Sequence, residues 1–154
     1  MVSYWRGSWF VVAAALVSAA PGARAALGEP YASVESDRIH MAARISVAAA
    51  ATHTVHSLTL ANRSEVREFT RADGTVFAVT WRGPSRPDLR RLLGARFDAF
   101  QAQTARRAGP RSRRALMVNR SELVINSAGH PGGFWGYAYV PSLVPSGFPL
   151  ASLQ

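Results

Sequence analysis

The sequence predicts an α+β fold, in which an antiparallel sheet carries one amphipathic helix on a face. Three observations support this class. β-rich runs alternate with turn signals between residues 54 and 82. A helical stripe of large apolar residues follows between residues 89 and 100. Further extended runs occur between residues 115 and 140. We therefore expect a three-stranded meander and a C-terminal hairpin in one sheet.

The expected meander consists of residues 54–61, 65–71 and 75–82. Asp73-Gly74, between the second and third runs, is a two-residue hairpin signal, because glycine adopts positive φ at little cost. In the third run Phe77, Val79 and Trp81 alternate with smaller residues. This period of two predicts a strand with one large apolar face.

One helix is expected after the meander, with Ser85 or Arg86 at its boundary and Pro87 in its first turn. The apolar stripe of this helix consists of Leu89, Leu92, Leu93, Phe97 and Phe100. Because these positions follow a period of 3.6 residues, the stripe is expected to pack on the large apolar face of the meander. Gly109-Pro110 is expected to end the helix.

The remaining segments carry weaker patterns. A short helix is expected near residues 34–43, and residues 48–52 are expected to form a connector. The other extended candidates are residues 115–118, 123–127 and 134–140, with a loop at 129–133. Residues 26–140 would then form a single domain. Residues 141–154 contain three prolines and are expected to be an irregular surface tail.

Residues 1–25 have the pattern of a cleavable export signal. An apolar run at 9–20 follows a segment with one positive charge, and Ala23-Arg24-Ala25 has the small residues that a signal peptidase requires. Cleavage is expected after Ala25, with Ala26 as the neighbouring alternative. An uncleaved anchor would need about twenty apolar residues. We therefore expect the mature protein to be periplasmic or secreted.

Composition limits the chemistry. The chain has no cysteine, which excludes disulfides, thiol nucleophiles and thiolate metal sites. All 18 basic residues are arginine, and sixteen of them follow residue 25, against nine acids, which gives a net charge of +7 there. An exported protein does not meet the nucleic acid of the cell, so we do not expect nucleic acid as the target. The expected partners are an anionic envelope polymer, lipid head groups or another protein. No cofactor or metal is expected.

A basic segment follows the expected helix. Its five arginines are Arg106, Arg107, Arg111, Arg113 and Arg114. Guanidinium groups clustered near Gly and Pro could form a loop that binds phosphate or phospholipid head groups. The alternative is a solvated linker that only keeps the protein soluble.

Aromatic and histidine side chains provide the other candidates. Trp135, Tyr137 and Tyr139 alternate along one face of a strand, as a platform for sugar rings or as cross-strand packing in the core. Solvent exposure distinguishes these alternatives. His130 lies in a Gly/Pro loop, where function often concentrates. His53 and His56 are three apart, so a strand would place them on opposite faces, unable to share a metal ion.

The favoured hypothesis is a non-catalytic binding module for an anionic or glycan envelope component or a partner protein. The alternative is a small periplasmic hydrolase with His130 or His56 as general base. The chain has no G-x-S-x-G motif, and most acids lie beside an arginine, as in Asp37-Arg38 and Arg67-Glu68. That pattern indicates ion-paired surface residues.

Several segments together resemble a known family. They are Ala26-Leu27-Gly28, Thr54-Val55-His56, Val66-Arg67-Glu68-Phe69, Pro87-Asp88-Leu89-Arg90, Gly129-His130 and, most specifically, the block from Gly74 to Pro84. The chain resembles the bacterial exported family known as domain of unknown function 2844. Ser57 departs from the family, which tends to carry an acid there. The resemblance implies a small proteobacterial envelope protein, and it implies no activity or catalytic residue.

Overall fold

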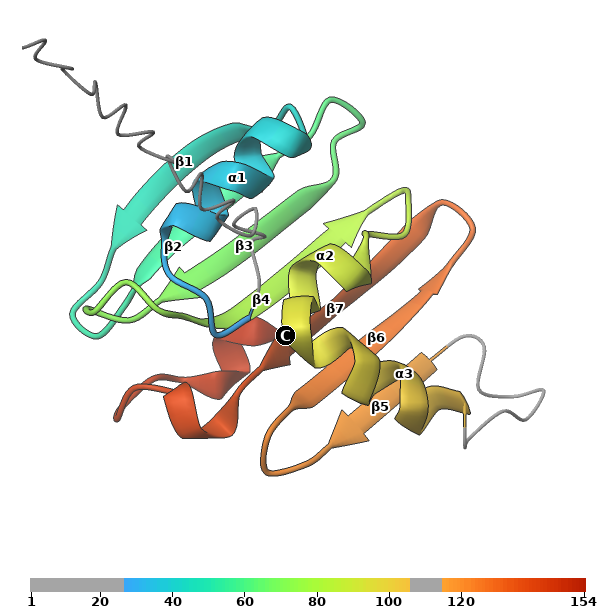
Figure 1. Ribbon diagram of the computed structural model, residues 1–154. Helices are drawn as coiled ribbons and strands as arrows, with labels where there is room; N and C mark the ends of the chain where they lie inside the picture. The colour runs from blue at the N-terminus through green and yellow to red at the C-terminus, as the bar shows by residue number, and fades with distance from the viewer. Residues whose placement is uncertain (1–26, 106–114) are drawn as a thin grey trace, which may run out of the picture.

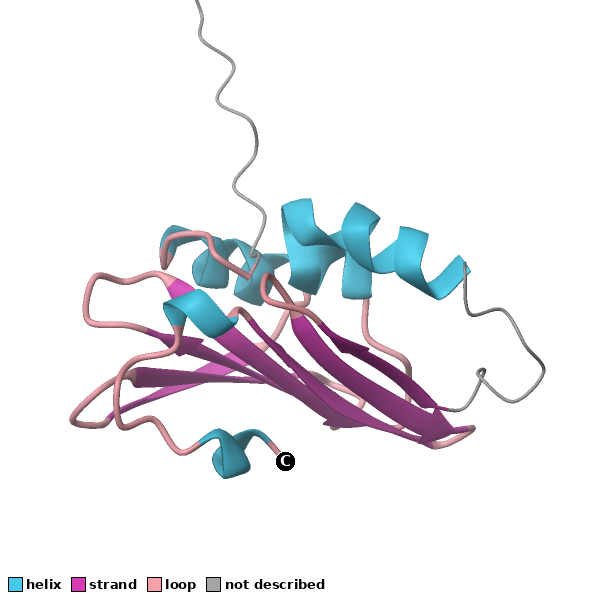
Figure 2. Cartoon of the chain, turned by 90° about the horizontal axis from the view of Figure 1, so that it is seen from below, coloured by secondary structure: helices cyan, strands magenta, loops and turns pink. Residues whose placement is uncertain are grey.

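A computed structural model describes residues 27–105 and 115–154. Seven antiparallel strands form one sheet, and the α-helices lie together on one of its faces (Figures 1 and 2). The predicted α+β class with an antiparallel sheet is therefore confirmed. The sheet is larger than a three-stranded meander plus a hairpin.

The strands are β1 (Arg44–Ala49), β2 (Thr54–Thr59), β3 (Glu65–Thr70), β4 (Val76–Gly83), β5 (Ala115–Asn119), β6 (Val124–His130) and β7 (Gly133–Tyr139). Their order in the sheet is β1-β2-β3-β4-β7-β6-β5. The central pair β4–β7 therefore joins two runs of consecutive strands that are separated in sequence by the helices after β4.

The helices are α1 (Ala32–His40), α2 (Leu89–Leu93) and α3 (Phe97–Ala105), with short 3₁₀ helices η1 (Gly94–Arg96), η2 (Pro141–Leu143) and η3 (Leu150–Leu153). The expected helix near 34–43 corresponds to α1. Within the described residues, no helix is long and apolar enough to cross a membrane.

Strand β1 was not expected from the sequence. It occupies the alanine-rich stretch before β2, and its residues are almost all exposed. Because β1 lies at the edge of the sheet and buries little, its alternation carries almost no hydrophobic signal. Thus the expected connector at 48–52 was partly wrong: Ala48 and Ala49 belong to the strand.

The larger core lies between the sheet and the helices. Val79 and Trp81 of β4, Val34 of α1, and Leu92 and Leu93 of α2 are buried in one cluster. The predicted packing of the apolar helical stripe on the sheet is therefore confirmed for these residues.

Phe77 does not share the face of Val79 and Trp81, contrary to the prediction from strand alternation. The pairing of β3 with β4 shifts register between Phe69 and Thr70. This irregularity sends Phe77 to the opposite side, where it is buried against Phe69.

The C-terminal tail covers part of that opposite face and is more ordered than the expected irregular segment. After η2 the chain folds back, and η3 lies under the sheet (Figure 2). Phe148 and Leu153 are buried there with Phe69 and Phe77. Three prolines prevent regular strand pairing, but they do not prevent burial of the apolar residues between them.

The expected long helix is interrupted. It begins with Asp88 as N-cap rather than at Ser85 or Arg86, and the Asp88 carboxylate accepts a hydrogen bond from Arg91 N (3.2 Å). Gly94 has φ of 52°, a conformation that ends α2 before η1 and α3 continue. The C-terminal stop expected at Gly109-Pro110 lies outside the described residues.

The hairpin of β6 and β7 is tighter than the expected loop at 129–133. Gly129 and His130 belong to β6, and Gly133 begins β7. Only Pro131-Gly132 remain as the turn, and Gly132 has φ of 88°.

Candidate functional site

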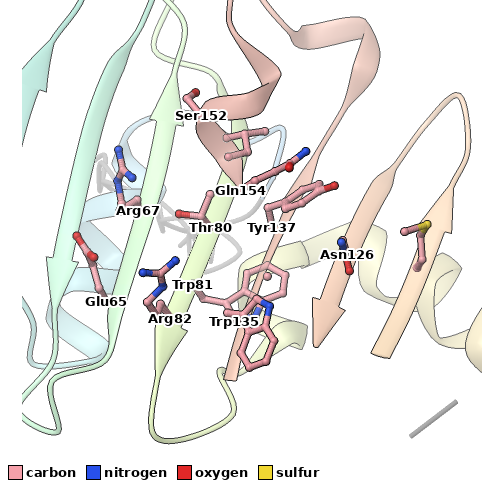
Figure 3. A pocket seen from close by; sticks show the side chains of 13 residues that line it. Glu65, Arg67, Thr80, Trp81, Arg82, Asn126, Trp135, Tyr137, Ser152 and Gln154 are labelled. Carbon is pink, nitrogen blue, oxygen red and sulfur yellow. The ribbon is translucent and has the colours of Figure 1, made fainter. Parts of the chain in front are cut away.

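A groove of about 700 Å³ lies on the sheet face opposite the α-helices, beside η3 (Figure 3). Its floor comes from β3, β4, β7 and β6, and Ser152, Leu153 and Gln154 form one side. The tail therefore covers one part of this face and borders the open part.

Strand register explains which side chains share the groove. In one row across the sheet Glu65 pairs with Arg82, which pairs with Trp135. In the next row Arg67 pairs with Thr80, which pairs with Tyr137 and then with Asn126. Because directly paired residues of antiparallel strands project from the same face, both rows point into the groove (Figure 3).

The three aromatic residues of β7 have different environments. Trp135 is 46% exposed at the groove. Tyr137 is half-buried and stacks on Tyr139, with ring centroids 6.3 Å apart and planes at 22°. Tyr139 packs against the second core cluster, which contains Phe69, Phe77, Phe148 and Leu153. Both interpretations from the sequence therefore apply to part of the row. Tyr139 contributes to packing in the core, whereas Trp135 is open to solvent and to a ligand.

The groove also carries charge. The Arg67 guanidinium lies over the ring of Phe69, 5.3 Å from its centroid, which orients it on the sheet surface. Arg82 is exposed next to Trp135 in the register, and Glu65 is the acid in the same row. Flat aromatic surface next to guanidinium and amide groups can hold a sugar ring and its carboxylate.

His130 lies at the end of the β6–β7 hairpin, near the groove. Its ring is 6.0 Å from that of Trp135, and its Nδ1 lies 3.0 Å from the carbonyl oxygen of Pro131. Within the described chain, no hydrogen bond or ion pair joins His130 to an acid. The structure therefore brings His130 close to the aromatic row without the partner that a general base requires.

His53 and His56 contact different faces of the sheet, as their spacing predicted. The ring of His53 lies 4.8 Å from that of Phe148 in the second cluster. His56 is buried beneath Tyr31, with Nε2 3.0 Å from Thr70 Oγ1. In the described ranges no group of three or more His, Asp or Glu side chains could hold a metal ion.

Two acids are buried rather than on an ion-paired surface, contrary to expectation. Asp37 is fully buried and pairs with Arg91 of α2, not with its neighbour Arg38. Glu68 is 2% exposed and directly opposite His56 on β2. Neither carboxyl oxygen of Glu68 has a hydrogen-bond partner within the described chain. Adjacency in sequence does not place Arg67 beside Glu68, because residues i and i+1 of a strand point to opposite faces. Asp37 and Arg38 are consecutive residues of α1, and consecutive helix residues do not face each other either.

Burial changes the ionisation of this cluster. Desolvation, together with the nearby Asp37 charge, raises the pKa of Glu68 to about 8, although the Arg91 charge partly opposes this rise. Desolvation lowers the pKa of His56. Both groups are therefore neutral near pH 7, and the cluster lies under α1 rather than in an open pocket.

The remaining candidates cannot be placed. Arg106, Arg107, Arg111, Arg113 and Arg114 lie outside the described residues, as do Ala25 and Ala26. Sequence reasoning had not selected Arg67, Arg82 or Asn126. Their alternation with buried neighbours was a usable signal, but it could not show that β4 pairs with β7.

Comparison with known proteins identifies the family. The model of the family described as protein of unknown function DUF2844 matches residues 23–153. The chain belongs to this family. No curated protein and no solved structure matches the chain. Because the function of this family is unknown, membership assigns no activity to the groove.

Proposed function

We propose that this protein is a non-catalytic binding module of the bacterial envelope whose groove holds an acidic glycan. The observation that carries the proposal is the exposed Trp135 ring, which shares its face of β7 with Tyr137 and is paired directly with Arg82. Arg67 lies in the same row as Tyr137, with Thr80 between them. The rings would stack on sugar faces, and the guanidinium groups would bind carboxylates.

The charge of the chain supports an anionic ligand. The residues after position 25 carry a net charge of +7, and the export signal expected at residues 1–25 would deliver the protein to a compartment with acidic polysaccharides. A hydrolase has weaker support. His130 contacts Trp135 and a carbonyl oxygen, and His56 is buried beneath α1.

Binding of a polyuronate such as alginate, with neutral dextran as comparison, tests the proposal by isothermal titration calorimetry. We expect alginate to bind and its affinity to fall as salt concentration rises, because exposed charges are screened. Trp135→Ala should weaken alginate binding about tenfold or more, as expected for loss of a central aromatic contact.

Ile39→Ala provides the matched control. Ile39 is a 64% exposed apolar residue on α1, on the other face of the sheet, so this variant should bind like the native protein. Equal alginate affinity in native protein and Trp135→Ala would contradict the proposal. Equal affinities for dextran and alginate would contradict the proposed preference for an acidic glycan over a neutral one.

A further inference from the structure

The outer side of β1 is an open edge of the sheet. β1 stands first in the strand order, so no strand of the described chain lies beyond it. An edge strand presents a row of backbone N–H and C=O groups that another strand can bind. We propose that β1 pairs antiparallel with β1 of a second copy of this chain, which joins two sheets into one. This inference does not depend on what the groove binds.

The β1–β2 hairpin shows which backbone groups of β1 point outward. The backbone N–H of Ala50 donates to the carbonyl oxygen of His53 at 2.8 Å, and therefore points toward β2. In an antiparallel pair, consecutive residues direct their backbone groups alternately toward the neighbouring strand and away from it. Ile45, Val47 and Ala49 thus direct their N–H and C=O groups away from β2. A second β1 centred on Val47 would bind all three residues with about six hydrogen bonds, two for each pair.

β1 lacks the features with which proteins usually protect an edge strand. These features are proline, charged side chains and β-bulges. Residues 45–49 consist of apolar residues and one serine, and they pair with β2 without a shift in register. Ile45 packs against the larger core and fixes the strand to the rest of the sheet. β1 is therefore a regular strand whose outer edge is open to pairing.

Two exposed apolar side chains lie beside this edge. Val47 is 57% exposed and is paired with His56 of β2. Tyr31 is 45% exposed, and its ring centroid lies 4.9 Å from that of His56. Directly opposite residues of antiparallel strands project from the same face, so Val47 would meet Val47 of the second copy. Pairing would then shield apolar surface from water as well as satisfy backbone groups.

The charge pattern of β1 is compatible with a second copy as the partner. In a register centred on Val47, Arg44 lies opposite Ala50 of the second copy. The two Arg44 residues are then about 20 Å apart along the strands. Repulsion between them is weak, because the Debye length is about 8 Å at physiological ionic strength.

The other edge strand, β5, is less suited to pairing with itself. In the sequence an arginine stands directly before it and another directly after it, Arg114 and Arg120. Like charges that lie opposite each other destabilise a pair of strands. The comparison of the two edges therefore favours β1.

Sedimentation equilibrium of the native protein from about 10 µM to 1 mM tests the dimer. Paired edges bury less than the roughly 1,600 Å² of a typical stable interface, so we expect a dissociation constant of about 0.1 mM. Val47→Lys should raise it at least about tenfold, because it sets two positive charges opposite each other. Met117→Lys is the matched control, since Met117 is a 59% exposed apolar residue of β5. This variant should dimerise like the native protein.

Native protein that stays monomeric at 1 mM, or equal dissociation constants for the native protein and Val47→Lys, would overturn the proposal. Because Val47 is mostly exposed, lysine at this position should leave the fold intact.

A single introduced cysteine tests the register, because the chain has no cysteine of its own. Val47→Cys would face its copy with Cα atoms about 5.5 Å apart, within the range of a disulfide. Ala49→Cys, on the same strand and face, would lie about 14 Å from its copy, which is too far. With oxidised glutathione, Val47→Cys should therefore form covalent dimers at least about tenfold faster than Ala49→Cys. Equal rates would contradict pairing centred on Val47.

Discussion

Glu68 is the residue whose environment differs most from what its type suggests. It lies in the middle of β3, opposite His56, with the Asp37–Arg91 pair above it. An acid that keeps its proton to about pH 8 in the folded protein, but loses it near its ordinary pKa of 4.5 when unfolded, destabilises the fold between these values. In that range the unfolded chain binds fewer protons, so the free energy of unfolding falls as pH rises.

Glu68→Gln should therefore flatten this pH dependence and raise stability at pH 8 and above. The gain is at most about 5 kcal/mol, from the difference between the two pKa values. Urea unfolding at a series of pH values measures it. Glu65→Gln, an exposed position on the same strand, should leave the profile unchanged. A less stable Glu68→Gln variant would instead indicate that ionised Glu68 pairs with a protonated His56.

At the scale of elements, the C-terminal tail contributes stability through one aromatic anchor. Phe148 is 8% exposed, and its ring packs edge to face against two other rings. Its ring centroid lies 4.9 Å from that of Phe77 and 5.8 Å from that of Phe69. Phe148→Ala should lower the free energy of unfolding by about 3 kcal/mol, as is typical when a buried ring is removed. Urea unfolding measures this loss. Leu150→Ala, in the same tail but 41% exposed, should change it by less than about 0.5 kcal/mol. Equal unfolding midpoints would mean that the tail does not stabilise the sheet.

The elements also show how far sequence reasoning reaches. β2, β3 and β4 were predictable because alternation of large apolar residues and the Asp73-Gly74 turn are local signals. β1 was not, because an exposed, alanine-rich edge strand has no apolar face to reveal it. The break in the helix at Gly94 could not be predicted from the sequence, because a glycine within an apolar stripe is compatible with a continuous helix. The φ of 52° at Gly94 in the structure reveals the break.

The candidate site was only half predictable for a related reason. The period of two along β7 is a local signal, and it is sufficient to predict that Trp135 and Tyr137 share one face. The arginine partners come from β3 and β4, and the pairing of β4 with β7 bridges about fifty residues of chain. Such a long-range pairing is not encoded in local spacing, and neither is the burial of Glu68 under α1.

At the scale of the whole molecule, the sheet keeps its two faces for different contacts. The α-helices cover one face, while the C-terminal tail covers only part of the other (Figures 1 and 2). The groove lies on this second face, beside the tail. Which ligands the protein meets depends on its compartment, and hence on the fate of residues 1–25.

Export can be tested with two neighbouring substitutions. A signal peptidase requires a small residue directly before the bond that it cleaves. If cleavage follows Ala25, Ala25→Asp should block it and leave the full-length mass, whereas Ala26→Asp should be processed. If cleavage follows Ala26, the two results should be exchanged. Mass spectrometry of the protein from the membrane and periplasmic fractions of a bacterium that expresses the chain distinguishes the outcomes. Full-length native protein that stays in the cytoplasm would contradict export and with it the choice of an envelope glycan over nucleic acid as the polyanion.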